Sequence, residues 1–214
     1  MKRRIVILTK SNKKGGYCVA GLDSKTGEWV RLVSDDQQSN GALSKKNMTY
    51  PTGYACVPLD VVDVEIVSKQ PSAYQPENLL IDSTHPLVRH AKSALSDVLR
   101  IHPAETKPYL FGNPNQYLNE EEIRGIGYSL TLVRVSHLVI GRTQNMDGKI
   151  KTKASFRYNG EEYLNMSVTD PRMYDVANGQ AYETAHIVVS LPDQPYPYGC
   201  YYKFIAKIFV DSDR

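Results

Sequence analysis

Short segments rich in apolar and β-branched residues, some of them alternating with polar positions, recur along much of the chain and predict β-strands. These segments are 4–9, 16–22, 28–33 and 54–67, and then 128–143, 150–158, 161–169, 186–191 and 201–210. The stretch between these two sets lacks this pattern. We therefore predict a mainly β protein whose strands fall into two groups, within residues 1–70 and 126–214.

The segment 71–125 carries the one extended helical pattern. Apolar residues recur there at three- and four-residue spacing from Leu87 to Leu99, and Thr84 can cap a helix that begins next to it. This spacing predicts one amphipathic helix over about 85–101. Its apolar stripe would suit packing between the two groups of strands or contact with a second copy of the chain.

Three short motifs predict turns or helix starts. Asp23 to Gly27 has the composition of a tight turn, and Asn159-Gly160 is a strong signal for a two-residue hairpin. Asn119 with Glu122 has capping-box spacing, which predicts a single helical turn. The first group holds four or five predicted strands and the second holds five, and a five-stranded unit of about 70–90 residues fits a small closed sheet such as the OB-fold. We expect two small OB-like β-barrels joined by a helical connector.

Charge is distributed unevenly, although the net charge of +3 is small. Residues 1–34 hold eight Lys or Arg against two acids, and residues 142–157 hold five against one. Such concentration is typical of nucleic-acid surfaces, and it also occurs on solvated strand faces and hairpin tips. Both interpretations remain open from the sequence.

The first basic concentration includes a glycine-containing stretch, Asn12 to Gly16. A phosphate-binding P-loop needs a helix after its glycines, whereas a strand pattern follows here, so we exclude that motif. The lysines of this stretch either solvate a hairpin tip or reach a phosphate backbone.

Single-stranded nucleic acid binding needs cations beside exposed aromatic rings. Trp29 shares a strand face with Arg31, and Phe156 shares one with Tyr158. Trp29 and Phe156 are more typical of a core, whereas tyrosines are better candidates for exposure. The residues that we predict to bind nucleic acid are Lys10, Lys13, Lys14, Tyr17, Arg31, Lys151, Lys153 and Tyr158. We interpret the run PYPYGCYY at 195–202 as a rigid approach to the last strand.

The sequence offers no catalytic or metal-binding pattern. The histidines are scattered and no CxxC pair occurs, so we expect neither a metal nor a cofactor. Ser167, Asp170 and His186 could suggest a catalytic group, but Asp170 before Pro171 is better explained as a helix N-cap. The three cysteines and the absence of a leader or membrane-spanning run favour a cytoplasmic protein with reduced thiols.

Five segments of the chain form a further pattern: RIVILTKS, GGYCVAGLD and GEWVRLVS near the N-terminus, then FRYNGEEYLNMSVTDP and YYKFIAKIFVD. Together they resemble the dual OB-containing domain family. The resemblance implies a bacterial protein with tandem OB folds, nucleic-acid or nucleotide binding, and a setting in conflict or defence systems. It supplies no catalytic residues.

Together these observations predict a non-enzymatic module that binds single-stranded DNA or RNA. Two alternatives remain open. One is a sensor that holds a nucleotide-like small molecule or an adaptor that binds a partner protein, and the other is an enzyme whose site the sequence does not reveal.

Overall fold

The computed structural model describes residues 1–13, 15–144 and 148–210, and the chain divides into two compact units. Unit 1 comprises Met1–Ser72 and Pro76–Pro103, and unit 2 comprises Ala73–Gln75 and Ala104–Arg214. Residues 1–70 lie within unit 1 and residues 126–214 within unit 2, and the residues of the predicted connector 71–125 are divided between the two units.

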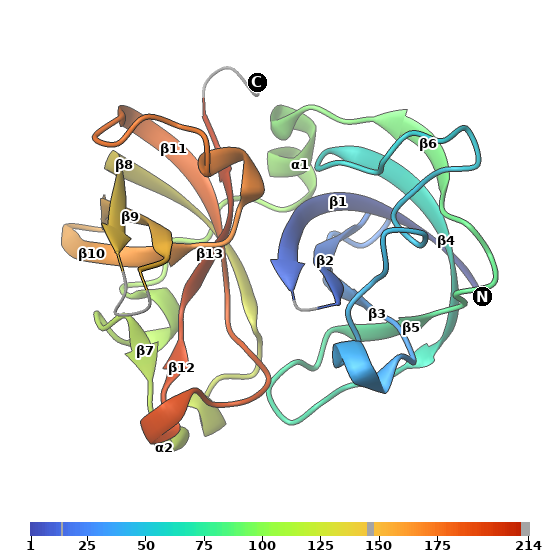
Figure 1. Cartoon of the computed structure of the whole chain (residues 1–214), viewed down its shortest axis with the longest axis horizontal. Helices are drawn as coiled ribbons and strands as arrows, with labels where there is room; N and C mark the ends of the chain where they lie inside the picture. The colour runs from blue at the N-terminus through green and yellow to red at the C-terminus, as the bar shows by residue number, and fades with distance from the viewer. Residues whose placement is uncertain (14, 145–147, 211–214) are drawn as a thin grey trace. The chain divides into compact units, whose positions relative to one another are not determined.

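Unit 1 contains a five-stranded ring and one additional strand (Figure 1). The ring strands are β1 (Lys2–Lys13), β2 (Gly16–Asp23), β3 (Trp29–Val33), β4 (Asp60–Lys69) and β5 (Asn78–Ile81). They run in the order β1-β2-β3-β5-β4, and β4 pairs again with β1. The β3–β5 pair is parallel and the other ring pairs are antiparallel. A Greek-key ring of five strands is the OB-fold arrangement.

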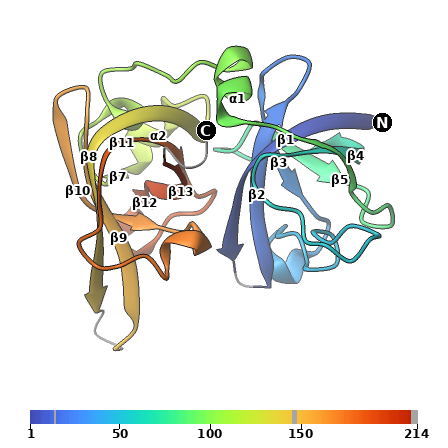
Figure 2. The same ribbon diagram turned by 90° about the horizontal axis from the view of Figure 1, so that it is seen from above.

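Unit 2 contains a closed barrel in the order β10-β13-β11-β8-β9. Its strands are β8 (Leu130–Gln144), β9 (Ile150–Tyr158), β10 (Glu161–Val168), β11 (Ala181–Ser190) and β13 (Phe204–Phe209). In this ring β8, β9, β10, β11 and β13 take the places that β1, β2, β3, β4 and β5 take in unit 1. The pair β10–β13 is parallel, as the pair β3–β5 is in unit 1. Figure 2 shows β8 and β9 as a long hairpin. The prediction of two OB-like barrels in a mainly β chain is confirmed.

Short elements lie outside the two rings. In unit 2, β7 (Tyr117–Leu118) pairs with β12 (Tyr201–Tyr202), and α2 (Glu120–Arg124) follows β7. Four 3₁₀ segments complete the set: η1 (Gln37–Ser39), η2 (Leu110–Gly112), η3 (Pro171–Met173) and η4 (Pro197–Gly199). Neither α-helix of the described chain is long and apolar enough to cross a membrane.

The alternation of β9 decides which side chains face the barrel interior. Thr152, Ala154, Phe156 and Tyr158 are buried, whereas the residues between them are exposed or half-exposed. The hairpin from β9 to β10 uses Asn159 at φ 49° and Gly160 at φ 88°, as the Asn-Gly signal predicts. The buried expectation for Phe156 is confirmed, and this residue stacks on Tyr163 of β10 at 5.5 Å between ring centroids.

The predicted helix over 85–101 is wrong for most of its length. Residues Val88–Lys92 form strand β6, which pairs antiparallel with β4, and α1 spans only Leu95–Ile101. Both elements belong to unit 1. The apolar spacing reflects a strand followed by a short helix, because pairing with β4 stabilises 88–92 in the extended conformation.

The second helix prediction is confirmed. Asn119 Oδ1 accepts a hydrogen bond from Glu122 N at 2.9 Å, and Glu122 Oε2 accepts one from Asn119 N at 2.8 Å. These reciprocal bonds form the capping box that begins α2, and Gly125 ends the helix.

Candidate nucleic-acid interface

The outer face of β9 carries three cations, Lys151, Lys153 and Arg157. Lys151 is exposed and Lys153 is half-exposed. Lys153 Nζ donates a hydrogen bond to Ser167 Oγ of β10 at 2.8 Å, and burial together with the neighbouring Lys151 lowers the pKa of Lys153. Arg157 further along the strand is paired with Glu162 at 2.7 Å. Among the described residues Lys151 forms no ion pair, so the unpaired charge on this face lies at the Lys151 end of the strand.

A row of side chains continues from Lys153 across the barrel. Lys153 lies opposite Ser167 of β10, Ser167 lies opposite Phe204 of β13, and Phe204 lies opposite Ser190 of β11. Phe204 is half-exposed, while the next residue, Ile205, is fully buried. Because strand neighbours point to opposite faces, Phe204 belongs to the same outer face as Lys153.

Tyrosines extend this row beyond the barrel strands. Tyr196 contacts Phe204 and Tyr202, each at 5.6 Å between ring centroids. Tyr202 in turn contacts Tyr117 at 5.7 Å, across the β7–β12 pair. We call Tyr117, Tyr196, Tyr198, Tyr202 and Phe204 the aromatic surface.

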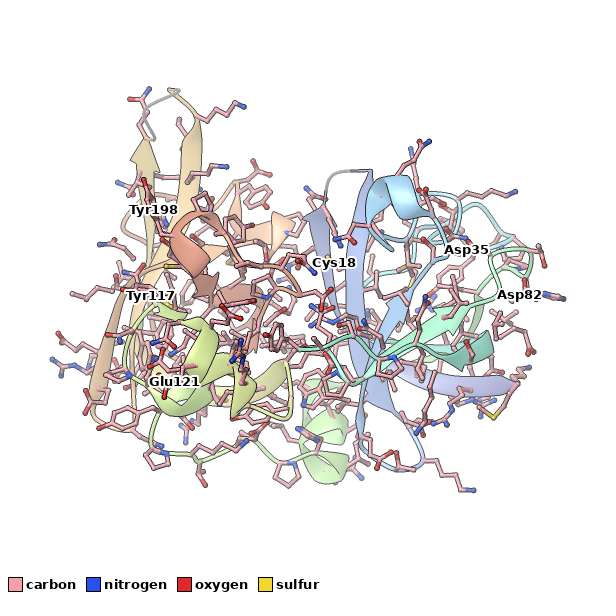
Figure 3. The ribbon with its side chains drawn as sticks, turned by 90° about the horizontal axis from the view of Figure 1, so that it is seen from below. Cys18, Asp35, Asp82, Tyr117, Glu121 and Tyr198 are labelled. Atoms are coloured by element: carbon pink, nitrogen blue, oxygen red, sulfur yellow. The ribbon has the colours of Figure 1, made fainter. Side chains whose placement is uncertain are left out.

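Tyr198 is the most accessible member of the aromatic surface, with its side chain 100% exposed. It lies in η4 with a positive φ of 67°, in a turn that a hydrogen bond from Gly199 N to Tyr196 O helps to close. Figure 3 labels Tyr117 and Tyr198, both in unit 2. The ring of Tyr198 is therefore accessible to a stacking partner.

The position of this surface within the barrel corresponds to the binding side of OB folds. Counted within unit 2, β9 and β10 are the second and third strands, and residues 191–203 connect the fourth strand to the fifth. The face of strands two and three and the loop between strands four and five are where OB folds bind oligonucleotides and oligosaccharides.

The sequence comparison agrees with this architecture. A family model described as the dual OB-containing domain matches residues 3–208. The chain belongs to this family. No curated protein matches the sequence of this dual OB protein. A solved structure described as "Structural mimicry for functional antagonism" has a TM-score of 0.38 and 9% identity, and the alignment covers 99% of this chain and 92% of that chain.

Two of the predicted residues in unit 2 of the dual OB protein face outward, and one does not. Lys151 and Lys153 lie on the outer face described above. The prediction that Tyr158 is exposed is wrong, because its side chain is only 2% exposed and its hydroxyl donates to Glu105 O at 3.2 Å. Tyr158 has the same strand parity as Phe156, so both point into the barrel.

The lysines predicted in the first hairpin of the dual OB protein contact their own chain. Lys10 Nζ donates to Cys56 O at 2.9 Å and lies 4.5 Å from the centroid of the Tyr17 ring. Burial lowers the pKa of Lys10. Lys13 Nζ donates to Asn40 O at 2.7 Å. Tyr17 is half-buried and packs against the core of unit 1, and Lys14 lies outside the described residues. Lys13 lies next to the hairpin tip, opposite Gly16, whereas Lys10 lies further along the strand, opposite Val19.

Arg31 is a buried residue rather than a surface cation. Its side chain is 8% exposed, and its Nε donates to Glu77 Oε1 at 3.2 Å. Arg31 alternates with the core residues Val30 and Leu32, so it lies on the outer face of β3, but Glu77 pairs with it there and it is buried. The prediction of an accessible cation is therefore wrong for Arg31. Trp29 is half-buried and meets His102 edge-on at 5.3 Å.

The polar residues near the end of β10 have structural roles. Asp170 accepts a hydrogen bond from Arg172 N at 3.1 Å, as the N-cap interpretation predicts. Its other carboxylate oxygen, Oδ2, accepts from the buried Lys207 Nζ at 2.7 Å and from Ile208 N at 3.1 Å. Within the described ranges, no three His, Cys, Asp or Glu side chains gather as metal ligands would.

The sequence interpretation missed the aromatic surface. Four tyrosines occur within residues 195–202, which is a compositional signal. We interpreted that run as a structural approach to the last strand, and the turn at η4 agrees with this. What the run alone could not show is that Tyr202 contacts Tyr117, which is distant in sequence.

Proposed function

We propose that the dual OB protein is a non-enzymatic module that binds single-stranded nucleic acid on the outer face of unit 2. The observation that carries this proposal is the continuous row from Lys153 through Ser167 and Phe204 to Tyr196. It combines cations and aromatic rings on the face that OB folds use for oligonucleotides.

Each part of the row has a separate role in this proposal. Lys151 and Lys153 would neutralise backbone phosphates, which releases counterions and makes affinity fall with salt. Tyr196 and Tyr198 would stack on bases, and each such contact contributes about 1–3 kcal/mol. Bases in a duplex are already stacked on one another, so this arrangement favours a single strand over a double strand.

The exposure of the rings argues against a small-molecule sensor at this place. Small-molecule sites enclose most of their ligand's surface, whereas Tyr198 is fully exposed and Tyr117 and Tyr196 are about half exposed. Exposed tyrosines do also occur at protein interfaces. Salt dependence separates these partners, because affinity that depends on counterion release falls steeply with salt.

The test is fluorescence anisotropy with labelled single- and double-stranded DNA and RNA at about 50 and 200 mM salt. Tyr198→Ala should weaken single-strand binding about tenfold at either salt concentration, because a stacking contact is lost. Lys151→Gln with Lys153→Gln should reduce the slope of log affinity against log salt by about 1.4.

Matched controls lie in unit 1. Tyr54 is 77% exposed and lies outside the aromatic surface, so Tyr54→Ala should leave affinity unchanged. Lys45→Gln with Lys46→Gln removes the same charge from two exposed residues. Equal weakening by the control and site variants, or no binding to any oligonucleotide, would refute the proposal. A Lys13→Gln variant tests the first hairpin separately.

A further inference from the structure

The N-terminal end of unit 1 contains a basic hollow that the proposed interface does not use. Its volume is about 400 Å³, and it is largely open to solvent. The residues lining it are Lys2, Arg3, Arg4, Ser24, Lys25 and Asp63. They come from the start of β1, the turn after β2 and the middle of β4.

Positive charge exceeds negative charge in the basic hollow. Four of its lining residues are cations and one is a carboxylate. A second carboxylate, Asp23, lies beside it and accepts a hydrogen bond from Arg3 Nη1 at 3.0 Å. Four positive and two negative charges give a net charge of +2. The hollow is therefore suited to an anion.

Both carboxylates are held by arginines. Arg4 donates from Nε and Nη2 to the two oxygens of Asp63, at 2.7 and 3.1 Å. Lys2 Nζ lies 3.2 Å from the same carboxylate. These partners lower the pKa of Asp63 to about 2, so it remains ionised and keeps the cations in place. Cations that are already positioned lose little conformational entropy when a ligand binds.

Donor capacity remains after these internal pairs are made. A guanidinium has five N–H donors, and the bonds to carboxylates use one from Arg3 and two from Arg4. The Lys25 ammonium forms no ion pair within the described chain, and Ser24 adds a hydroxyl. Several donors with a net charge of +2 match a phosphoryl group, which has three acceptor oxygens and a charge near −2.

We propose that the basic hollow is a phosphate-binding site that takes the phosphoryl group of a nucleotide or of a nucleic acid. The site lies wholly in unit 1, so this inference does not rest on the interface proposed for unit 2. This proposal assigns a function to the excess of Lys and Arg near the N-terminus. The contacts of the hairpin lysines do not account for that excess.

The test is a titration of the full chain with inorganic pyrophosphate, in which calorimetry measures the affinity and amide NMR shifts locate the binding site. Amides of residues 2–4 and 24–25 should shift most. Lys2→Gln with Lys25→Gln should weaken binding at least about tenfold, because two charge-assisted contacts are lost. Lys45→Gln with Lys46→Gln removes equal charge from exposed positions of the same unit and should leave affinity unchanged.

If both double variants weaken pyrophosphate binding equally, or if the largest amide shifts lie elsewhere, the proposal is overturned.

Competition experiments then test whether the site recognises the phosphoryl group itself. Displacement of pyrophosphate by a nucleoside diphosphate or by a 5′-phosphorylated oligonucleotide supports the site, and the stronger competitor identifies the source. Displacement by an unphosphorylated nucleoside would overturn it. Because Tyr198→Ala does not alter the basic hollow, pyrophosphate binding by that variant separates failure of this site from failure of the unit 2 interface.

Discussion

At the scale of single residues, a buried lysine supports the aromatic surface. Lys203 is 1% exposed and immediately precedes Phe204. Its Nζ donates to Asn113 O at 2.7 Å and to Asn113 Oδ1 at 2.6 Å. The Tyr163 hydroxyl also donates to Asn113 O, at 3.2 Å. Burial lowers the pKa of Lys203 to about 7. Lys203 thus anchors the chain between Tyr202 and Phe204 through hydrogen bonds.

This lysine predicts a pH dependence of stability. The unfolded lysine has a pKa of about 10.4, so between about pH 7 and 10 the unfolded state binds more protons than the folded state. The free energy of unfolding should therefore rise with pH in this window, by up to about 1.4 kcal/mol per pH unit. Chemical denaturation of the native chain and of Lys203→Met across the window measures the difference.

The expected outcome is a smaller pH slope in Lys203→Met than in the native chain. Lys46→Met, which changes an exposed lysine, serves as the control and should keep the native slope. Parallel curves for the native chain and Lys203→Met would contradict the lowered pKa, even if the variant is less stable at every pH.

Predictions about single residues were confirmed where they depend on interactions between residues that are close in sequence. The capping box of Asn119 and Glu122, the hairpin at Asn159-Gly160 and the N-cap at Asp170 each depend on neighbours within a few residues. Arg31 depends on Glu77, which is 46 positions away, so its burial could not be predicted from its surroundings in the sequence.

At the scale of elements, the β1–β2 pair depends on a glycine at a close approach. A Cβ at Gly21 would lie 2.0 Å from Val6 O, a backbone atom of the neighbouring strand. Gly21 lies opposite Ile7, next to an irregularity in the ladder between Ile7 and Thr9. A methyl group there would require the two strands to separate.

We predict that Gly21→Ala lowers the free energy of unfolding by about 2 kcal/mol or more. Gly127 is the matched control, because a Cβ there meets nothing within 4 Å and its φ is not positive. Gly127→Ala should change stability by less than about 0.5 kcal/mol. Urea denaturation measures the free energy of unfolding of both variants. A similar loss of stability in each would show that the close contact between position 21 and Val6 O does not cause the effect.

Elements with long two-residue alternation were predicted well, and β6 was not. The segment Val88–Lys92 is exposed throughout and has no alternating burial that could identify it as a strand. Its extended conformation depends on hydrogen bonds to β4, such as the pairing of Asp60 with Lys92. A local pattern cannot reveal such a partner, so helical spacing was the better local description.

At the scale of the whole molecule, the chain passes between the units more often than a simple tandem would require. Residues Ala73–Gln75 lie between β4 and β5 of unit 1 in sequence but belong to unit 2. Tyr74 meets Tyr201 edge-on at 5.1 Å, and the buried Gln75 Nε2 donates to Leu191 O at 3.1 Å. A domain boundary predicted from composition could not assign residues 73–75 to unit 2.

We predict that Tyr74→Ala with Gln75→Ala lowers the stability of unit 2, by about 2–3 kcal/mol. Native-state hydrogen exchange reports the two units separately, because each has its own barrel amides. Protection should fall in β11 and β13 and stay unchanged in β1 and β2. Loss of protection in β1 and β2 alone would contradict the assignment of residues 73–75 to unit 2.

The sequence by itself determined the β class, most of the barrel strands and the hairpin at Asn159-Gly160, but not β5 (Asn78–Ile81). It also carried the family resemblance, which the family match over residues 3–208 confirms. These features follow from alternation and turn chemistry, which act between near neighbours. Only the tertiary structure decided which lysines and tyrosines share a face, because barrel closure brings Lys153, Ser167 and Phe204 into one row from three strands. In unit 1, the pairing of β1 with β4 that closes the ring likewise brings together the residues of the basic hollow, which come from β1, β4 and the turn after β2. Strand order and register fix these neighbours, and neither is written in the local pattern of any one strand.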